Sequence, residues 1–83
     1  MSKKEKAFAR LLSKCTDFTW DEAVSVMKQH GFKILNGRGS SRKFVHKSTG
    51  VKVLIHEPHP GNIVKAYALQ DLIDGLKNAG EMK

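Results

Sequence analysis

The chain has 83 residues, of which 15 are Lys or Arg and 8 are Asp or Glu, so its formal charge at neutral pH is +7. A chain of this length buries only about 60% of its unfolded surface, which excludes a separate cofactor-binding domain. The single cysteine excludes a disulfide framework and a multi-cysteine zinc site, and no apolar run approaches the roughly 20 residues of a membrane span. We therefore expect one domain over residues 1–83, in the reducing cytoplasm and without a membrane.

Cationic residues are concentrated in the middle of the chain. Between Glu22 and Glu57 the sequence has no acidic residue and seven basic ones, which are Lys28, Lys33, Arg38, Arg42, Lys43, Lys47 and Lys52. A polyanion is the natural partner of such a block, because neutralising phosphates releases their counterions. A solvated face that only keeps the protein in solution would have the same composition, so charge alone leaves both interpretations open.

The first predicted element is a helix over residues 3–14. Phe8, Leu11, Leu12 and Cys15 recur there at the i, i+3, i+4, i+7 spacing of an amphipathic helix. We expect this stripe to dock on the domain, with the Cys15 thiol packed and without a catalytic partner.

A second helix is predicted over residues 19–30. Thr19 is a suitable N-cap, and Glu22 three residues later completes a capping box. Gly31 follows where a left-handed residue is needed to end the helix. The residues expected on its buried face are Trp20, Ala23, Val24 and Met27.

Three β-rich segments follow, at residues 32–35, 42–46 and 51–56, and turn-forming residues separate them. The segment 57–61 contains two prolines and cannot continue a central strand. Apolar residues at helical spacing then predict a final helix over residues 66–79. This order predicts an α+β fold of α-β-β-β-α type: a three-stranded antiparallel sheet with helices packed on one face, plus an extra N-terminal helix.

The pairing of the second and third strands can be predicted from their apolar residues. Phe44 and Val53 should face each other across the core side, which requires a four-residue loop at 47–50. This register places three pairs on the open face: Ser41 opposite His56, Lys43 opposite Leu54, and Val45 opposite Lys52. We therefore expect the open face to be basic and to carry an imidazole.

Three runs of the sequence carry a family resemblance: Gly31-Phe32, the run GSSRKFVH that begins at Gly39, and the run HEPHPG that begins at His56. With these runs in this order the chain resembles the HicA family of bacterial toxins, with residues 18–80 as the HicA-like core and 1–17 as a helical extension. The resemblance implies a double-stranded-RNA-binding-like (dsRBD-like) fold. It also implies mRNA interferase activity, which is endoribonuclease cleavage of mRNA independent of translation, and neutralisation by a HicB-like antitoxin protein.

One position departs from the family. The family's catalytic histidine directly follows Gly-Ser at the start of the second strand, and this chain has Ser41 there. A serine hydroxyl does not titrate near neutral pH, so it cannot replace an imidazole as a general base. Ser41 marks either a branch of the family with a rearranged site or a deliberate inactivation of a toxic protein.

Cleavage of RNA through its 2′-hydroxyl needs a base, an acid and cations around the phosphorus. His56 is the best remaining candidate for proton transfer because the predicted register sets it beside Ser41, although it could also simply end a strand and pack on Pro58. The residues expected to contact RNA are Arg38, Arg42, Lys43, Lys52 and His59.

Two further histidine signals favour structure over chemistry. His46 has the same strand parity as Phe44, which predicts a partly buried, hydrogen-bonded histidine. His56 and His59 have the spacing of metal ligands, but Pro58 breaks the geometry and no carboxylate or cysteine cluster joins them, so we expect no metal and no cofactor.

Two functions therefore remain open. The first is a toxin that is an endoribonuclease, or a variant of one impaired at Ser41. The second is a small RNA-binding module without catalysis. The rate of cleavage of single-stranded RNA, compared with that of a His56→Ala variant, separates them.

Overall fold

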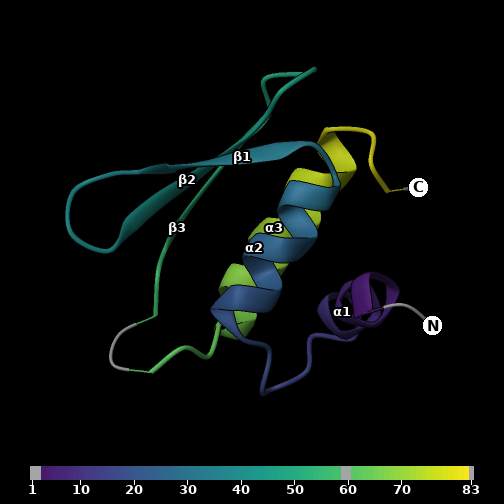
Figure 1. The fold of residues 1–83 in the computed structure, drawn as a ribbon, viewed down its shortest axis with the longest axis vertical. Coiled ribbons are helices and arrows are strands. Elements are labelled where there is room, and N and C mark those ends of the chain that lie inside the picture. The colour runs from purple at the N-terminus through teal and green to yellow at the C-terminus, as the bar shows by residue number, and fades with distance from the viewer. Residues whose placement is uncertain (1–2, 59–60, 83) are drawn as a thin grey trace.

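The computed structural model describes residues 3–58 and 61–82. Its elements in chain order are α1 (Lys3–Leu12), α2 (Trp20–Gln29), β1 (Phe32–Asn36), β2 (Ser41–His46), β3 (Lys52–His56) and α3 (Ala66–Asn78). The strands form one antiparallel sheet in the order β1-β2-β3 (Figure 1). The predicted α+β class, with a three-stranded sheet and an additional N-terminal helix, is confirmed.

The start of α2 forms as its sequence predicts. The Thr19 hydroxyl accepts a hydrogen bond from the Glu22 amide at 3.2 Å, and the Glu22 carboxylate accepts one from the Thr19 amide at 3.1 Å. This capping box satisfies two amide groups that the first turn of a helix leaves without partners. Gly31, with φ +85°, then ends the helix and turns the chain into β1.

The predicted pairing of β2 with β3 is confirmed residue by residue. Phe44 pairs with Val53 on the core side. The open-face pairs are Ser41 with His56, Lys43 with Leu54, and Val45 with Lys52. The sheet therefore presents the basic face that the alternation of apolar residues indicated.

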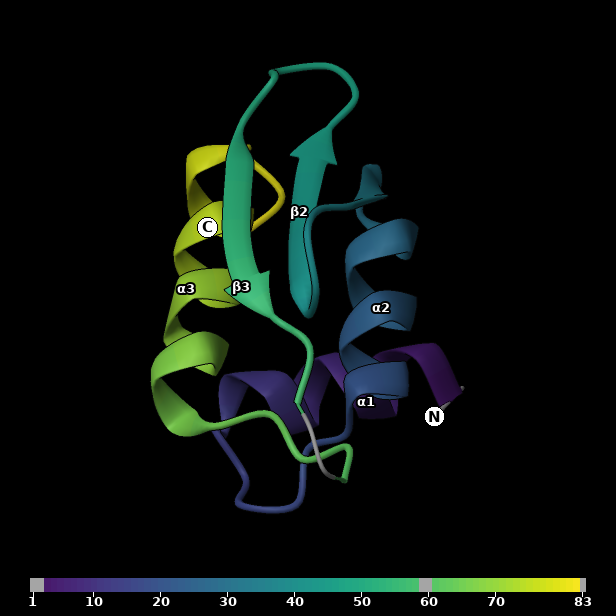
Figure 2. The same ribbon diagram turned by 90° about the vertical axis from the view of Figure 1, so that its left-hand side faces the viewer.

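The helices lie on one side of the sheet. Figure 2 shows β2 and β3 in front of α2 and α3, while α1 crosses the lower ends of both helices. The core is apolar apart from the buried His46, and its largest buried side chains are those of Leu11, Phe18, Met27, Phe32, Phe44, Leu69, Leu72 and Leu76. This arrangement leaves the opposite face of the sheet uncovered.

One residue of α2 departs from the predicted buried face. Val24 is only partly buried, whereas Val26 is fully buried. Val26 lies one helical turn after Glu22, and Glu22 is the residue that α1 contacts through Arg10. Docking of α1 thus buries a side of α2 that the helix would otherwise expose to solvent.

The α3 helix lies unusually close to β3. A Cβ atom added at Gly75, in the middle of this helix, would overlap Cγ2 of Val53. Glycine is unfavourable inside a helix, so its presence here reflects this close approach. The contact fixes α3, and therefore its N-terminal end, relative to the last residues of β3.

Candidate functional site

The end of the β2–β3 pair brings an exposed imidazole next to a serine-containing turn. His56, the last residue of β3, lies opposite Ser41, and the backbone pairing continues through a 2.7 Å bond from the Glu57 amide to the Ser40 carbonyl. The His56 Nδ1 atom lies 3.3 Å from the Ser40 hydroxyl. Sequence reasoning placed Ser41 beside His56 but missed Ser40. Strand parity carries no information about Ser40 because this residue belongs to the turn before β2.

The contact with Ser40 has a chemical consequence for the imidazole. When Nδ1 carries the ring proton and donates it to the Ser40 hydroxyl oxygen, Nε2 is left as the unprotonated acceptor, because a neutral imidazole has one donor and one acceptor nitrogen. Among the residues that the structure describes, Nε2 of His56 has no hydrogen-bond partner. An exposed imidazole oriented through one nitrogen has its other nitrogen available for proton transfer.

A hollow of about 270 Å³ adjoins this imidazole. Its lining includes Ser40, His56, Glu57 and Pro58 from the sheet end, and Lys65 and Tyr67 from the start of α3. The Glu57 carboxylate is paired with the Arg42 guanidinium at 3.1 Å. Tyr67 is 66% exposed, and neither it nor Lys65 was expected in the site. The signal that could have found Tyr67 is its position off the apolar stripe of the last helix, where an aromatic residue contributes nothing to the core.

The N-terminal end of α3 opens on the same side. Lys65 is its N-cap residue and makes no side-chain cap bond, and the first turn has no acidic residue. The amide groups of an uncapped first turn and the positive end of the helix dipole both favour an anion. A base, a cation, an aromatic ring and a helix end therefore surround one hollow.

The predicted RNA-binding cations do not all converge there. Arg38 is exposed in the turn before β2, Lys43 lies half-buried in the centre of the open face, and Lys52 is exposed at the opposite end of β3 from His56. At about 3.3 Å per residue, Lys52 lies roughly 13 Å along the strand from His56. His59 falls outside the described residues.

Arg42 differs from the other predicted cations because its guanidinium is hydrogen-bonded to other residues of the protein. Its guanidinium donates to the Glu57 carboxylate at 3.1 Å, and to the carbonyl oxygens of Gly39 at 2.9 Å and Ser41 at 2.8 Å. The side chain is only 19% exposed. These bonds tie the turn before β2 to the residue after β3, so Arg42 holds the backbone around Ser40 and His56 in place.

A second imidazole of the sheet, that of His46, is held inside the protein. Its Nδ1 accepts a hydrogen bond from the Thr49 amide at 3.2 Å, so the ring proton resides on Nε2, which donates to the Glu81 carboxylate at 3.2 Å. The ring packs edge-on against Phe32 with 4.9 Å between centroids. His46 is 5% exposed, which confirms the predicted structural histidine.

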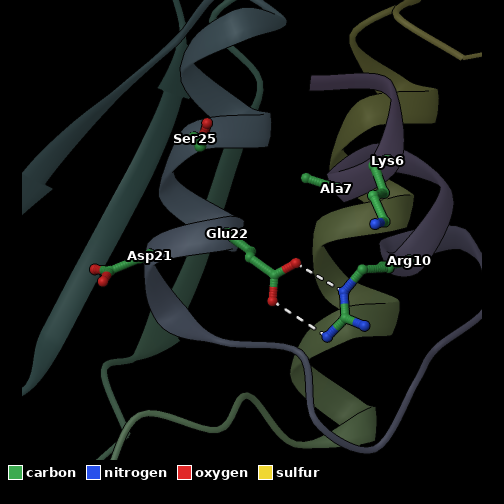
Figure 3. Close-up of a pocket in the computed structure, with 6 residues that line it drawn as sticks. All are labelled: Lys6, Ala7, Arg10, Asp21, Glu22 and Ser25. Atoms are coloured by element: carbon green, nitrogen blue, oxygen red, sulfur yellow. Dashed lines mark hydrogen bonds and ion pairs between the residues drawn. The ribbon is translucent and has the colours of Figure 1, made fainter. Parts of the chain in front are cut away.

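A second hollow, of about 460 Å³, lies between α1 and α2 (Figure 3). The Arg10 guanidinium spans it and contacts the two Glu22 carboxylate oxygens at 2.7 Å and 3.3 Å. Burial raises the pKa of the Glu22 carboxyl, but the hydrogen bonds from Arg10 and Thr19 outweigh this effect and hold that pKa below its ordinary value. Arg10 and Glu22 pair with each other here, and the lining has no imidazole or thiol.

Two features that the described residues lack bear on other classes of function. Within 3–58 and 61–82 no cluster of three or more His, Cys, Asp or Glu residues is arranged to hold a metal ion. In the same residues no helix has both the length and the apolar character needed to cross a membrane.

Comparison with known proteins identifies the family. The family described as the HicA toxin of bacterial toxin-antitoxin systems matches residues 20–81, which include α2, the whole sheet and α3. The α1 helix lies outside the match. Comparisons with curated proteins and with solved structures found no match. Since the family match covers most of the chain and agrees with the fold, this protein belongs to the HicA family of bacterial toxins.

Proposed function

We propose that this toxin is an mRNA interferase, a cytoplasmic endoribonuclease that binds mRNA at the His56 end of the sheet and that a HicB-like antitoxin neutralises. The observation that carries the proposal is the exposed His56 imidazole, oriented by Ser40 and facing a hollow that Lys65 and Tyr67 also line. Family membership supports a toxin acting on a cellular target. The charge of +7 supports RNA as that target.

The proposed reaction uses the RNA's own 2′-hydroxyl as nucleophile. The neutral His56 imidazole takes the proton of this hydroxyl through Nε2, and the 2′-oxygen forms a bond to the adjacent phosphorus. The bond from phosphorus to the 5′-oxygen breaks, and that oxygen receives a proton from water. The products are a 2′,3′-cyclic phosphate and a 5′-hydroxyl, so no metal or redox partner is required.

The remaining groups supply binding and charge. Lys65 and the amide groups at the start of α3 are suited to stabilise the charge that develops on the phosphate oxygens. Tyr67 offers an exposed ring on which an unpaired base can stack. Arg38, Lys43 and Lys52 contact the RNA backbone on either side, and Arg42 acts as a positioning residue that holds the turn before β2. We retain His59 as a further backbone contact on the basis of sequence.

Ser41 favours a second candidate function. By resemblance it occupies the position of the family's catalytic histidine, and it lies opposite His56. Among the residues that the structure describes, the site then has one imidazole where two proton transfers are needed. A protein that binds RNA at this site without cleaving it would need the cations and Tyr67, but not the imidazole.

Cleavage and binding of the same RNA distinguish the two functions. We would measure both on a single-stranded RNA oligonucleotide for the wild type, for His56→Ala and for the control His30→Gln, which changes an imidazole at the far end of α2. If the protein is an endoribonuclease, His56→Ala should lose cleavage and keep most of its RNA affinity, while His30→Gln should keep both. Binding by the wild type without cleavage would instead establish the non-catalytic module.

A further inference from the structure

The open face of the sheet alternates lysine with apolar residues. Across the three strands, one row of outward-facing residues consists of Lys33, Val45 and Lys52, and the next consists of Leu35, Lys43 and Leu54. Lysine thus occupies the ends of one row and the centre of the next. We call these six residues the mixed face.

Two leucines of the mixed face are left in water. Leu35 is 44% exposed and Leu54 is 64% exposed, and they lie on opposite sides of Lys43. Both leucines, together with Lys43, line a hollow of about 260 Å³. Neither leucine contributes to the fold as a core residue does, so covering them would bury apolar surface without disturbing the core.

The composition of the mixed face favours a protein over a nucleic acid. RNA bases bind to sheets mainly by stacking on outward-facing aromatic rings, and in the described strands the two aromatic residues, Phe32 and Phe44, are buried in the core. Phosphates would pair with the lysines but would leave the leucines uncovered. A protein surface can supply carboxylates and apolar side chains together, which is the complement that this pattern requires.

We infer that the mixed face is the docking surface for the antitoxin. An apolar side chain of the antitoxin enters the hollow between Leu35 and Leu54, and carboxylates of the antitoxin pair with Lys33, Lys43 and Lys52. This inference rests on the proposed function for the identity of the partner. RNA and antitoxin then share the lysines, but only the antitoxin uses the leucines.

The leucines allow a test that separates the two ligands. Leu35→Ser, Leu54→Ser and the double variant would be compared with Leu12→Ser, a control at a leucine that is 43% exposed on α1 and outside the mixed face. The measurements are the dissociation constant for the antitoxin encoded with this toxin, and the binding and cleavage of a single-stranded RNA oligonucleotide. Thermal unfolding of each variant shows that the fold is intact.

We expect each sheet variant to weaken antitoxin binding roughly tenfold, and the double variant roughly a hundredfold, as truncation of a buried interface anchor does. RNA binding and cleavage should change less than about twofold, because substituting an exposed leucine removes no phosphate contact. Leu12→Ser should change neither. Lys43→Ala should weaken the binding of both RNA and the antitoxin.

Three results would overturn the inference. Unchanged antitoxin affinity in the double variant would exclude the mixed face as its docking surface. Loss of RNA binding with unchanged antitoxin affinity would assign the face to RNA instead. If the antitoxin failed to bind the wild-type protein, its identification as the partner of this surface would be wrong. If the leucine variants lose the antitoxin but the wild type cleaves no RNA, then the inference stands and the ribonuclease activity fails.

Discussion

His46 and His56 are the last residues of β2 and β3, so they lie at opposite ends of one antiparallel pair. His46 points into the protein, where Thr49 and Glu81 engage both ring nitrogens. His56 is exposed and contacts the Ser40 hydroxyl. The same residue type in the same hairpin is thus fully satisfied at one end and available for chemistry at the other.

Two features of the fold cause this difference. The first is strand alternation, which directs His46 to the side of Phe44 and His56 to the open face. The second is the segment after α3, which brings Glu81 over His46 and also within 3.5 Å of the His30 ring. A histidine with both nitrogens occupied therefore stabilises the fold, whereas one with a free nitrogen next to a hollow is a candidate for catalysis.

The largest expected effect is on activity at the exposed end. His56→Ala should lower the rate of RNA cleavage by about 10² to 10⁴, which is the contribution typical of a positioned acid or base. Its free energy of unfolding should change by less than about 0.5 kcal/mol, because the side chain is exposed. Single-turnover cleavage and urea unfolding on the same preparation check both parts. A variant that unfolds readily would show that His56 is structural after all.

The next largest expected effect is a gain of RNA cleavage at the His56 end of the β2–β3 pair. Side chains paired across two antiparallel strands have Cβ atoms roughly 4.5 to 5.5 Å apart, so Ser41→His would place a second imidazole within reach of the phosphate that His56 serves. We expect cleavage to rise by about 10²-fold, and growth inhibition on expression to rise with it.

The control for this gain is Ser41→Gln, which adds a polar side chain that does not titrate. Its cleavage rate should stay at the wild-type level. A folded Ser41→His protein with no more activity than Ser41→Gln would refute the transfer of the family's catalytic role to this position.

At the buried end the effect should appear in stability. His46→Ala removes the ring packed on Phe32 and takes from the Glu81 carboxylate its 3.2 Å contact with Nε2, so we expect a loss of about 2 to 3 kcal/mol in the free energy of unfolding. Chemical denaturation measures this loss. Glu81→Gln, which keeps an acceptor for the Nε2 proton, should cost less. Equal losses in His46→Ala and His56→Ala would abolish the contrast between the two histidines.

The smallest expected effect is on stability at low pH. It tests whether the Glu22 carboxylate, rather than either of these histidines, contributes to the pH dependence of unfolding. Because the pKa of Glu22 is lower in the folded protein than its ordinary value of 4.5, the ionised carboxylate stabilises the fold above that value. This contribution is lost as the pH falls through the lowered pKa.

Glu22→Gln should therefore be less stable than the wild type at neutral pH by about 1 kcal/mol, and the difference should shrink below pH 4.5. The melting temperatures of both proteins would be compared over a range from about pH 3 to about pH 7. A difference that is constant across this range would show that ionisation of Glu22 does not contribute.

Much of the fold follows from the sequence by itself, because local rules determine it. The capping box at Thr19 and Glu22 fixes the start of α2, since it depends on residues three positions apart. The pairing of Ser41 with His56 follows from the alternation of apolar residues and the length of one loop, because a slip of one residue would expose Phe44. The three runs that resemble the HicA family were equally readable in the sequence.

Other features were decided only by tertiary structure, because they join residues far apart in the chain. Tyr67 and Lys65 reach the His56 hollow because the fold packs α3 closely against β3, with Gly75 next to Val53, and because backbone bonds tie residues 62–64 to the start of α2. Arg42 carries the charge expected of an RNA-binding residue, yet its guanidinium is hydrogen-bonded to Glu57 and to two carbonyl oxygens. Charge and spacing show which groups a chain carries, but the partners that engage each group depend on which distant segments the fold brings beside it.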